Sequence, residues 1–389
     1  MTTSLERARS VVAPDPTVRV LAVFALALGG FGIGTTEFVA MGLLPDIAAS
    51  FGITEPTAGH VISAYALGVV IGAPVIAALT ARWPRKTLLL TLMAVFTLGN
   101  VASMLAPTYL TLVIARFASG LPHGAFFGIA ALAAAHLMGP QNRAKAVAYV
   151  LCGLTVATVL GVPLASWLGQ ALGWRSAFGL VVVVGLVTLT AMWRWLPDHL
   201  RSMHVTSPMT ELSALRRPQV WLAVLVGMIG FGGMFAVYTY ISTTMTDVTG
   251  LPRSLVPVAL MVFGLGMVVG NLIGGRLADI SVIRALYLSL GALAALPLLF
   301  GVGVAGSAVG PALQTRLMDV AHDAQTLAAA LNHSALNVGN ATGAWVGGLV
   351  IAAGLGYTAP AAAGAVLAVG GLLVFTLSVT LQRRTSTPR

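Results

Sequence analysis

Twelve apolar stretches separated by short polar turns account for most of the chain. A helix needs about 20 apolar residues to cross the hydrocarbon core of a bilayer, and most of these stretches reach that length. The pattern therefore predicts an all-α polytopic membrane protein. The predicted spans are residues 18–44, 57–81, 87–106, 109–138, 146–168, 174–196, 218–242, 255–278, 285–300, 302–318, 326–354 and 359–381.

One long polar segment divides these spans into six and six. It reads PDHLRSMHVTSPMTELSALRRP and begins at Pro197. We expect an N-terminal six-helix bundle over residues 1–196, a cytoplasmic linker over 197–217 and a C-terminal six-helix bundle over 218–389.

The two halves repeat parts of their sequence. YALGVVIGAPVIAALTA in the second span aligns with FGLGMVVGNLIGGRLAD in the eighth at an offset of 198 residues. LTVATVLG, ending at Gly161, aligns with LNVGNATG, ending at Gly343, at an offset of 182 residues. Repeats of this kind indicate duplicated halves with a binding site between them. Helices nine and ten share residues 285–318, which contain Pro297 and Pro311. The smaller second offset predicts that both are short, or else that one of them does not cross the membrane.

The charged residues set the orientation and exclude several classes of protein. Only 8% of the residues are charged, whereas a soluble domain carries about a quarter. The net charge of +10 comes from small groups of Lys and Arg between apolar runs, which argues against a nucleic-acid site. With both termini in the cytoplasm, 18 of the 21 basic residues fall on the inner side, as the positive-inside rule requires. The single cysteine, Cys152, excludes an intramolecular disulfide.

One carboxylate lies deep inside an apolar span. Ten of the eleven acidic residues fall in predicted loops, tails or span ends, and only Glu37 lies well within a span, the first. An ionisable side chain at that depth is costly unless it faces water or a partner, so Glu37 is a candidate proton-carrying group. The alternative is that Glu37 lies nearer the surface and snorkels toward it.

Arg116 in the fourth span is the candidate partner of this acid. Glu37 lies about 10 Å before the outer end of its helix, and Arg116 lies about as far past the start of its own. The two groups therefore sit at similar depth. If they pair, a transported molecule that separates them would change the proton occupancy of the acid. The alternative is a static ion pair that orients two helices.

Four polar residues in the fourth and eleventh spans complete the candidates. Histidine titrates near neutrality, so His123 and His333 are candidate proton relays, or else hydrogen-bonding packing residues. Asn337 and Asn340 are candidates to bind polar groups of a substrate, or else to join helices. We expect the substrate cavity to contain Glu37, His333, Asn337 and Asn340.

The fifth span, GLTVATVLGVPLASWLG, contains residues that change how a helix packs and bends. Gly153 and Gly161 let a neighbouring backbone approach closely, and Pro163 removes a hydrogen bond and bends the helix. Such a helix would act as a pivot or a seal between the halves. Ordinary packing of small residues is the alternative.

Three of these stretches resemble motifs of a known family. GTTEFVAMGLLPDIA, RFASGLPHGAFF and GLTVATVLGVPLASWLGQALGWR are similar to the first-, fourth- and fifth-helix motifs of the major facilitator superfamily. Within it, the chain resembles the twelve-span drug:proton antiporter branch, near the bacterial chloramphenicol-resistance and arabinose-efflux-like permeases. The resemblance covers residues 18–381 and implies two bundles rocking about a central cavity, with Glu37 as the proton-carrying acid and Arg116 as its partner.

The loop between the second and third spans departs from the family pattern. That pattern reads approximately Gly-x-Leu-Ala-Asp-Arg-x-Gly-Arg-Lys. This chain has ALTARWPRK, preceded by Ala77. Ala77 and Pro84 stand at the two glycine positions, and Ala81 stands at the aspartate position. It keeps the basic residues Arg82, Arg85 and Lys86, and the second-half copy keeps Gly275, Leu277, Ala278 and Asp279. The resemblance implies that Arg82, Arg85, Lys86 and Asp279 belong to a conformational motif.

These features predict a proton-coupled secondary transporter that exports a small, largely apolar organic compound or antibiotic resembling chloramphenicol. A sugar or metabolite exporter with the same fold is the alternative. A channel would need a continuous polar path, and an enzyme would need clustered nucleophiles, bases or metal ligands, none of which the sequence contains. We expect no cofactor other than protons as the coupling ion, and a monomer in the inner membrane.

Overall fold

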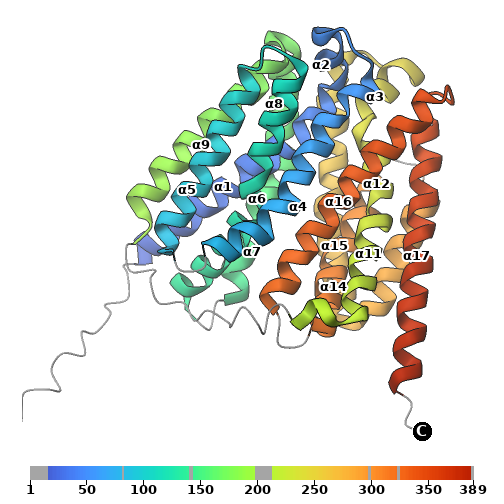
Figure 1. Cartoon of the computed structure of the whole chain (residues 1–389). Helices are drawn as coiled ribbons and strands as arrows, with labels where there is room; N and C mark the ends of the chain where they lie inside the picture. Colours follow the sequence, from blue (N-terminus) through green and yellow to red (C-terminus); the bar gives the residue numbers. More distant parts are fainter. Residues whose placement is uncertain are drawn as a thin grey trace, which may run out of the picture.

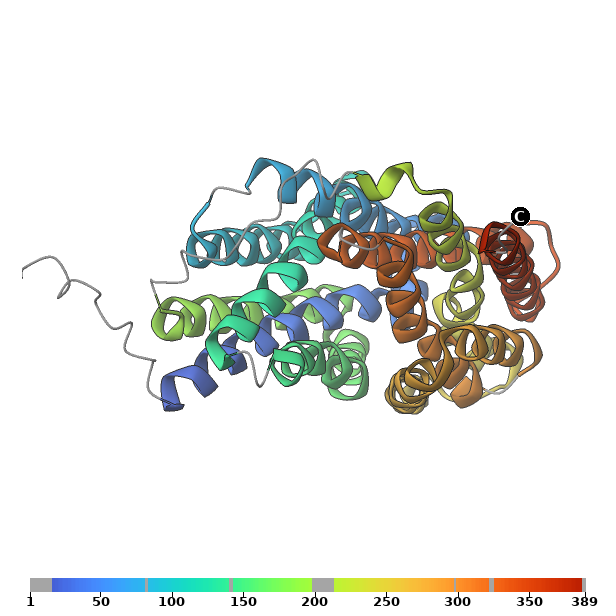
Figure 2. The same cartoon turned by 90° about the horizontal axis from the view of Figure 1, so that it is seen from below.

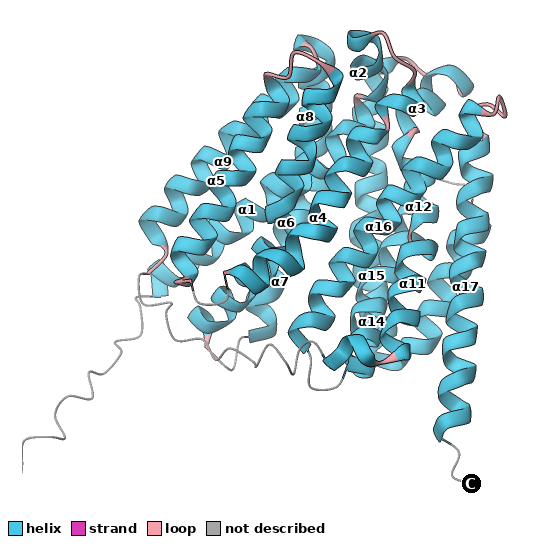
Figure 3. Ribbon diagram, in the orientation of Figure 1, coloured by secondary structure: helices cyan, strands magenta, loops and turns pink. Residues whose placement is uncertain are grey.

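The computed structural model describes residues 16–80, 83–139, 143–197, 213–296, 299–321 and 325–386. All regular structure within these ranges is helical (Figure 3). This confirms the all-α fold class.

The helices of the first half lie together on one side of the molecule, coloured blue to green in Figure 1, and the view from below agrees (Figure 2). They include a five-residue π-helical segment, η2. In chain order they are α1 (Pro16–Gly42), α2 (Leu44–Phe51), α3 (Glu55–Ala58), α4 (His60–Leu79), α5 (Arg85–Met104), α6 (Tyr109–Met138), α7 (Arg143–Val156), η2 (Ala157–Gly161), α8 (Val162–Leu172) and α9 (Trp174–Trp195).

The helices of the second half lie on the other side. The short elements that open this half are η3 (Ala214–Arg216), α11 (Pro218–Gly230), α12 (Gly232–Thr239), α13 (Ile241–Thr243), η4 (Thr244–Val248) and η5 (Arg253–Leu255). The long helices that follow are α14 (Val256–Ala295), α15 (Leu299–Ala321), α16 (Gln325–Ala352) and α17 (Ala359–Ser386). Residues 198–212 lie outside the described residues, so the division at 197–217 stays a prediction.

Ten helical segments of the described ranges are long and apolar enough to cross a membrane. α14 counts once among them, although Ser281 within it is extended (φ −166°, ψ 109°). The Ser281 hydroxyl accepts a hydrogen bond from the Arg284 backbone N–H at 3.3 Å, the geometry of a helix N-cap. α14 is therefore two helices that meet at Ser281. With the two parts of α14 counted separately and α15 added, the helices correspond in position to the twelve predicted spans, although α15 is not among the ten.

Two pairs of helices use glycine in the same way in the two halves. Gly68 and Gly72 of α4 lie directly against the carbonyl oxygens of Phe117 and Leu121 in α6, so that a Cβ at either position would collide. Gly266 and Gly270 of α14 lie in the same way against Phe300 and Val304 of α15. These are the glycines that the sequence repeat aligns, so the repeat preserves a close backbone contact that only glycine permits.

The second of these contacts fixes the direction of α15. Positions 266 and 270 meet 300 and 304 in the same order, so α15 runs parallel to the first part of α14. Residues 282–295 must therefore cross back between them. They span only about 21 Å, so helix nine is short, as predicted.

Helix ten is longer than its predicted range of 302–318, since α15 covers 23 residues. Pro311 lies inside α15 without ending it. A proline is tolerated within a membrane helix when neighbouring helices or side chains satisfy the backbone carbonyl that it leaves without a hydrogen bond.

Candidate functional site

Glu37 is buried in α1, with 6% of its surface exposed. Its carboxylate forms no hydrogen bond or ion pair with any described residue. Charged and phenolic groups surround it at electrostatic range: Arg116 of α6, Tyr65 of α4 and Tyr238 of α12. Because Tyr238 comes from the second half, the acid lies where the two halves meet. A buried carboxylate without a fixed partner is available to a proton or to a ligand.

Arg116 is anchored to the residue that precedes the acid. Its Nη1 donates to the Thr36 hydroxyl at 3.0 Å, and its Nη2 donates to the Thr36 carbonyl at 3.1 Å. The guanidinium carbon lies 4.4 Å from the centre of the Tyr65 ring. The direct ion pair considered from the sequence is not formed between these two described residues. Arg116 therefore influences Glu37 in two ways: by the electrostatic effect of its positive charge, and by holding the α1 backbone at the neighbouring residue, Thr36.

Asn100 of α5 completes this anchor. Thr36 Oγ1 donates to Asn100 Oδ1 at 2.6 Å, and Asn100 Nδ2 donates to the Phe96 carbonyl at 2.8 Å. Three helices of the first half are thus joined by one chain of buried hydrogen bonds. Sequence reasoning missed Thr36, Asn100 and Tyr65, although Asn100 is the only amide side chain in its span.

His123 and His333 both contact the phenyl ring of Phe127. His123 Nδ1 and the Tyr65 hydroxyl are hydrogen-bonded at 3.0 Å. The His123 and Phe127 rings have centroids 5.3 Å apart, and Phe127 stacks on His333 at 6.0 Å with the planes 6° apart. The ladder Tyr65–His123–Phe127–His333 therefore joins α4 and α6 to α16. Its apolar member, Phe127, contacts both histidines that were candidate proton relays.

Asn337 and Asn340 carry unmatched polar atoms on α16. Asn337 Nδ2 donates to the His333 carbonyl at 3.0 Å, but its Oδ1 has no partner within the described part of the chain. Neither side-chain polar atom of Asn340 has one either. The two residues are 4% and 1% exposed, and buried amides are nearly always hydrogen-bonded. These atoms are available to a ligand or to water.

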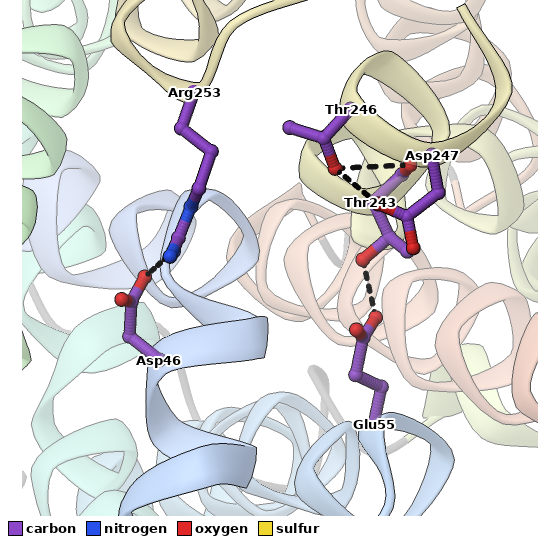
Figure 4. Close-up of polar contacts among 6 residues, drawn as sticks. All are labelled: Asp46, Glu55, Thr243, Thr246, Asp247 and Arg253. Atoms are coloured by element: carbon purple, nitrogen blue, oxygen red, sulfur yellow. Dashed lines mark hydrogen bonds and ion pairs between the residues drawn. The ribbon is translucent and has the colours of Figure 1, made fainter. Parts of the chain in front are cut away.

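The halves are also joined beyond Glu37, at the end of the molecule opposite the C-terminus, which we call the distal end. Figure 4 shows Arg253 of η5 paired with Asp46 of α2 at 2.6 Å, and Thr243 of α13 donating a hydrogen bond to Glu55 of α3. Nearer the acid, Phe38 stacks on Phe235 with centroids 6.0 Å apart. These contacts close the distal side of the site.

Comparison with known proteins gives the family. The family model described as Major Facilitator Superfamily matches residues 26–302. The chain belongs to this superfamily. This match confirms the family resemblance seen in the sequence and the expected fold. Members of the superfamily are secondary transporters rather than enzymes.

Several relatives cover nearly the whole of this superfamily member. The inner membrane transport protein YdhP of Escherichia coli (strain K12) is 42% identical over 93% of this chain and 97% of its own. The chloramphenicol resistance protein of Streptomyces lividans is 36% identical over 87% and 90% of the two chains. A probable sugar efflux transporter of Pasteurella multocida (strain Pm70) is 31% identical over 91% of each.

A solved structure shows the same fold. It is a bacterial homolog of the human lysosomal transporter Spinster, in an inward-facing and unoccupied conformation. The TM-score is 0.72 at 15% identity, over 94% of this chain and 97% of that one.

The fifth-helix motif of this superfamily member lies between its two halves. Gly153 packs against the Ala27 carbonyl, and Gly161 packs against Thr35, both on α1. The π-helical segment η2 ends two residues before Pro163, and within it the Thr158 carbonyl lies against Gly264 of α14. Short π-helical segments of this kind often occur at functional sites. The segment therefore contacts α1 on one side and the second half on the other.

The remaining motif residues lie at the end opposite the distal contacts. Arg85 and Lys86 open α5, and Asp279 lies two residues before the extended Ser281 of α14. Arg82 lies outside the described residues. The structure forms no ion pair between Arg85 and Asp279, which are both described, so the role of this motif stays a prediction.

Proposed function

We propose that this chain is a proton-coupled exporter of a small, largely apolar organic compound, with Glu37 as the proton-carrying group. One observation carries the proposal: the Glu37 carboxylate is buried at the contact of the two halves without a fixed partner among the described residues, and the nearby cation, Arg116, is bonded to Thr36. Glu37 can therefore exchange its proton while Arg116 stays in place.

Competition for this site would couple the two movements. A substrate that enters from the cytoplasm displaces the proton from Glu37, and a proton that enters from outside displaces the substrate. Inward proton movement supplies about 2.3 kcal/mol per charge per 100 mV, in addition to the pH gradient. One carboxylate is therefore enough for modest accumulation. Arg116 holds the α1 backbone at Thr36, and so keeps the acid in one place in both protonation states.

The orientation and setting follow from the charge pattern. With both termini in the cytoplasm, the distal contacts Asp46–Arg253 and Glu55–Thr243 lie on the outer side and close it. In this orientation we expect the cargo to reach Glu37 from the cytoplasm. The name of the relative YdhP supports placement in the inner membrane. We propose that the chain works as a monomer.

Two substrate classes are open to this site. The chloramphenicol resistance protein among the relatives, and the apolar and aromatic surroundings of Glu37, support an uncharged organic compound. The probable sugar efflux transporters among the relatives support the alternative, a sugar or similar metabolite. The unmatched amides of α16 suit either class, so transport itself must decide.

The test is accumulation of chloramphenicol in proteoliposomes that hold an imposed pH gradient, with labelled arabinose assayed in parallel. We expect gradient-driven accumulation of chloramphenicol that a protonophore abolishes. Glu37→Gln should lose the response to the gradient and keep exchange of drug across the membrane. Glu55→Gln is the matched control, since an amide at position 55 still accepts from Thr243, and it should keep the response. Accumulation that ignores the pH gradient would refute the proposal.

A further inference from the structure

The stacked pair Phe127–His333 lies away from Glu37, at a contact between the two halves. Phe127 is about 27 Å along α6 from its distal start, whereas Arg116 is about 10 Å along it. The pair therefore lies closer to the end that carries the C-terminus. Since α6 and α16 belong to opposite halves, we expect movement of one half against the other to change the distance between these rings.

The polar row on α16 continues from His333 toward the distal end. At about 100° per residue, His333, Asn337 and Asn340 fall within about 60° of one another on one face of the helix, along about 10 Å of its axis. His333 directs this face toward the first half, because it stacks on Phe127. The row thus begins at an aromatic pair and ends at an amide whose two polar atoms are unmatched within the described ranges.

This face has no charge of its own. α16 contains no Asp, Glu, Lys or Arg over its 28 residues. The three unmatched amide atoms of Asn337 and Asn340 can pair with hydroxyl or amide groups without desolvating an ion. A flat ring that enters between Phe127 and His333 keeps a stacked contact on both of its faces, whereas an aliphatic group loses it.

We propose that Phe127 and His333 determine the specificity of export by binding a flat aromatic ring of the substrate, while Asn337 and Asn340 bind its uncharged polar groups. The substrate class is then an uncharged compound with an aromatic ring and amide or hydroxyl groups within about 10 Å of it along the helix axis. This inference rests on the proposed export function and adds the residues that select the cargo.

The experiment is transport kinetics in the same proteoliposomes, with chloramphenicol, which has such a ring and such groups. His333→Leu and Phe127→Leu keep similar volume and remove a ring. Each should raise the KM for chloramphenicol about three- to tenfold and change kcat less than about twofold, in line with the strength of one aromatic contact. His333→Phe, which brings back a ring, should recover most of the lost affinity.

Phe126→Leu is the matched control on the same helix. Phe126 is buried and lies near Gly29 of α1 and Met93 of α5 within the first half. It meets Phe127 only edge-on, with ring centroids 6.1 Å apart, and it has no ring contact with His333. Its KM should stay within about twofold of the parent value, because the stacked pair is intact.

Three results would overturn this inference: an unchanged KM in both leucine variants, a fall in kcat alone, or a His333→Phe variant as impaired as His333→Leu. If chloramphenicol still accumulates with the pH gradient in those cases, the export function stands and only the ring site fails. If arabinose alone is accumulated, the ring site fails and the sugar alternative is supported. If no compound follows the gradient, the proposed function fails as well.

Discussion

Two buried asparagines, one in each half, are used in opposite ways. Asn100 of α5 accepts from Thr36 and donates to the Phe96 carbonyl, so both ends of its amide are matched. Asn340 of α16 is equally buried, and neither end is matched by any described residue. A matched amide fixes its neighbours, and an unmatched one leaves room for an exchangeable partner. Under the proposed function, the first half would hold the proton-carrying group in place, and the second half would offer polar atoms to the cargo.

This difference develops on two halves that pack alike. Gly68 and Gly72 in the first half, like Gly266 and Gly270 in the second, each lie against a backbone carbonyl of the neighbouring helix. Duplication supplied two similar frames, and the side chains placed between them differ in chemistry. Variants of each half can therefore be paired to test which differences belong to the frame and which to the site.

The largest effect is expected at Arg116. Arg116→Leu leaves the Thr36 carbonyl and hydroxyl without their donor and removes the cation near Glu37, so gradient-driven transport should fall by roughly 100-fold, the equivalent of about 3 kcal/mol. Arg316→Leu is the matched control. Arg316 is the buried arginine of α15, which donates to Gln219, Ser378 and Gln382. Its loss should lower thermal stability and leave the ratio of protons to drug unchanged. If the Arg116→Leu protein couples transport to protons normally, the hydrogen bonds between Arg116 and Thr36 are not needed for coupling.

The next effect concerns the frame. Gly72→Ala and Gly270→Ala each place a Cβ against a carbonyl oxygen of the neighbouring helix, and each should lower the free energy of unfolding by about 1–3 kcal/mol. Gly128→Ala and Gly275→Ala, where a Cβ meets nothing within 4 Å, are the controls for the two halves. Thermal unfolding in detergent measures all four. A large loss of stability from the alanine variant of one half, with none from that of the other, would show that the two halves do not depend on these glycine contacts equally.

A smaller and more specific effect separates the two asparagines. Asn100→Leu should destabilise the free protein by about 1–3 kcal/mol, because Thr36 loses its acceptor and the Phe96 carbonyl its donor. Asn340→Leu removes atoms that were unmatched, so stability should be kept or rise, while the KM for the cargo increases about tenfold. Thermal unfolding and transport kinetics on the two variants give both values. Equal losses of stability would show that Asn340 is an ordinary structural amide.

The smallest effect is expected at the distal contacts. The Asp46–Arg253 pair is partly exposed, and exposed ion pairs contribute about 0.2–1 kcal/mol. Arg253→Gln should therefore change turnover less than fivefold. The change should shrink at high salt, since added ions screen the parent pair. Turnover measured at two salt concentrations checks this, and a salt-independent loss would point to packing instead.

The spans were predictable because apolar length is a local property of sequence. α1 begins and ends within two residues of its predicted range, since hydropathy alone marks its limits. The turn inside α14 was harder to place, because neither proline nor glycine marks it. The capping side chain of Ser281 starts the second helix three residues earlier than predicted. α15 begins three residues before its predicted range and ends three residues after it.

The candidate site was predictable only in part. A lone acid and a lone arginine in apolar spans stand out by their cost, so Glu37 and Arg116 could be chosen from the sequence. The partners of Arg116 could not, because Thr36 lies 80 residues away on another helix and no periodic pattern connects them. The same holds for the stack of Phe127 on His333, since a phenylalanine in an apolar helix gives no signal of its own.

Proton release from purified protein on addition of chloramphenicol, in weakly buffered detergent solution, tests the role of Glu37 most directly. The parent protein should release protons as the drug binds. Glu37→Gln should still bind the drug and release none, and Asn340→Leu should release the same number at saturation but need more drug to reach it. If Glu37→Gln releases as many protons as the parent protein, Glu37 is a structural residue and the coupling group lies elsewhere, with His123 and His333 the next to test.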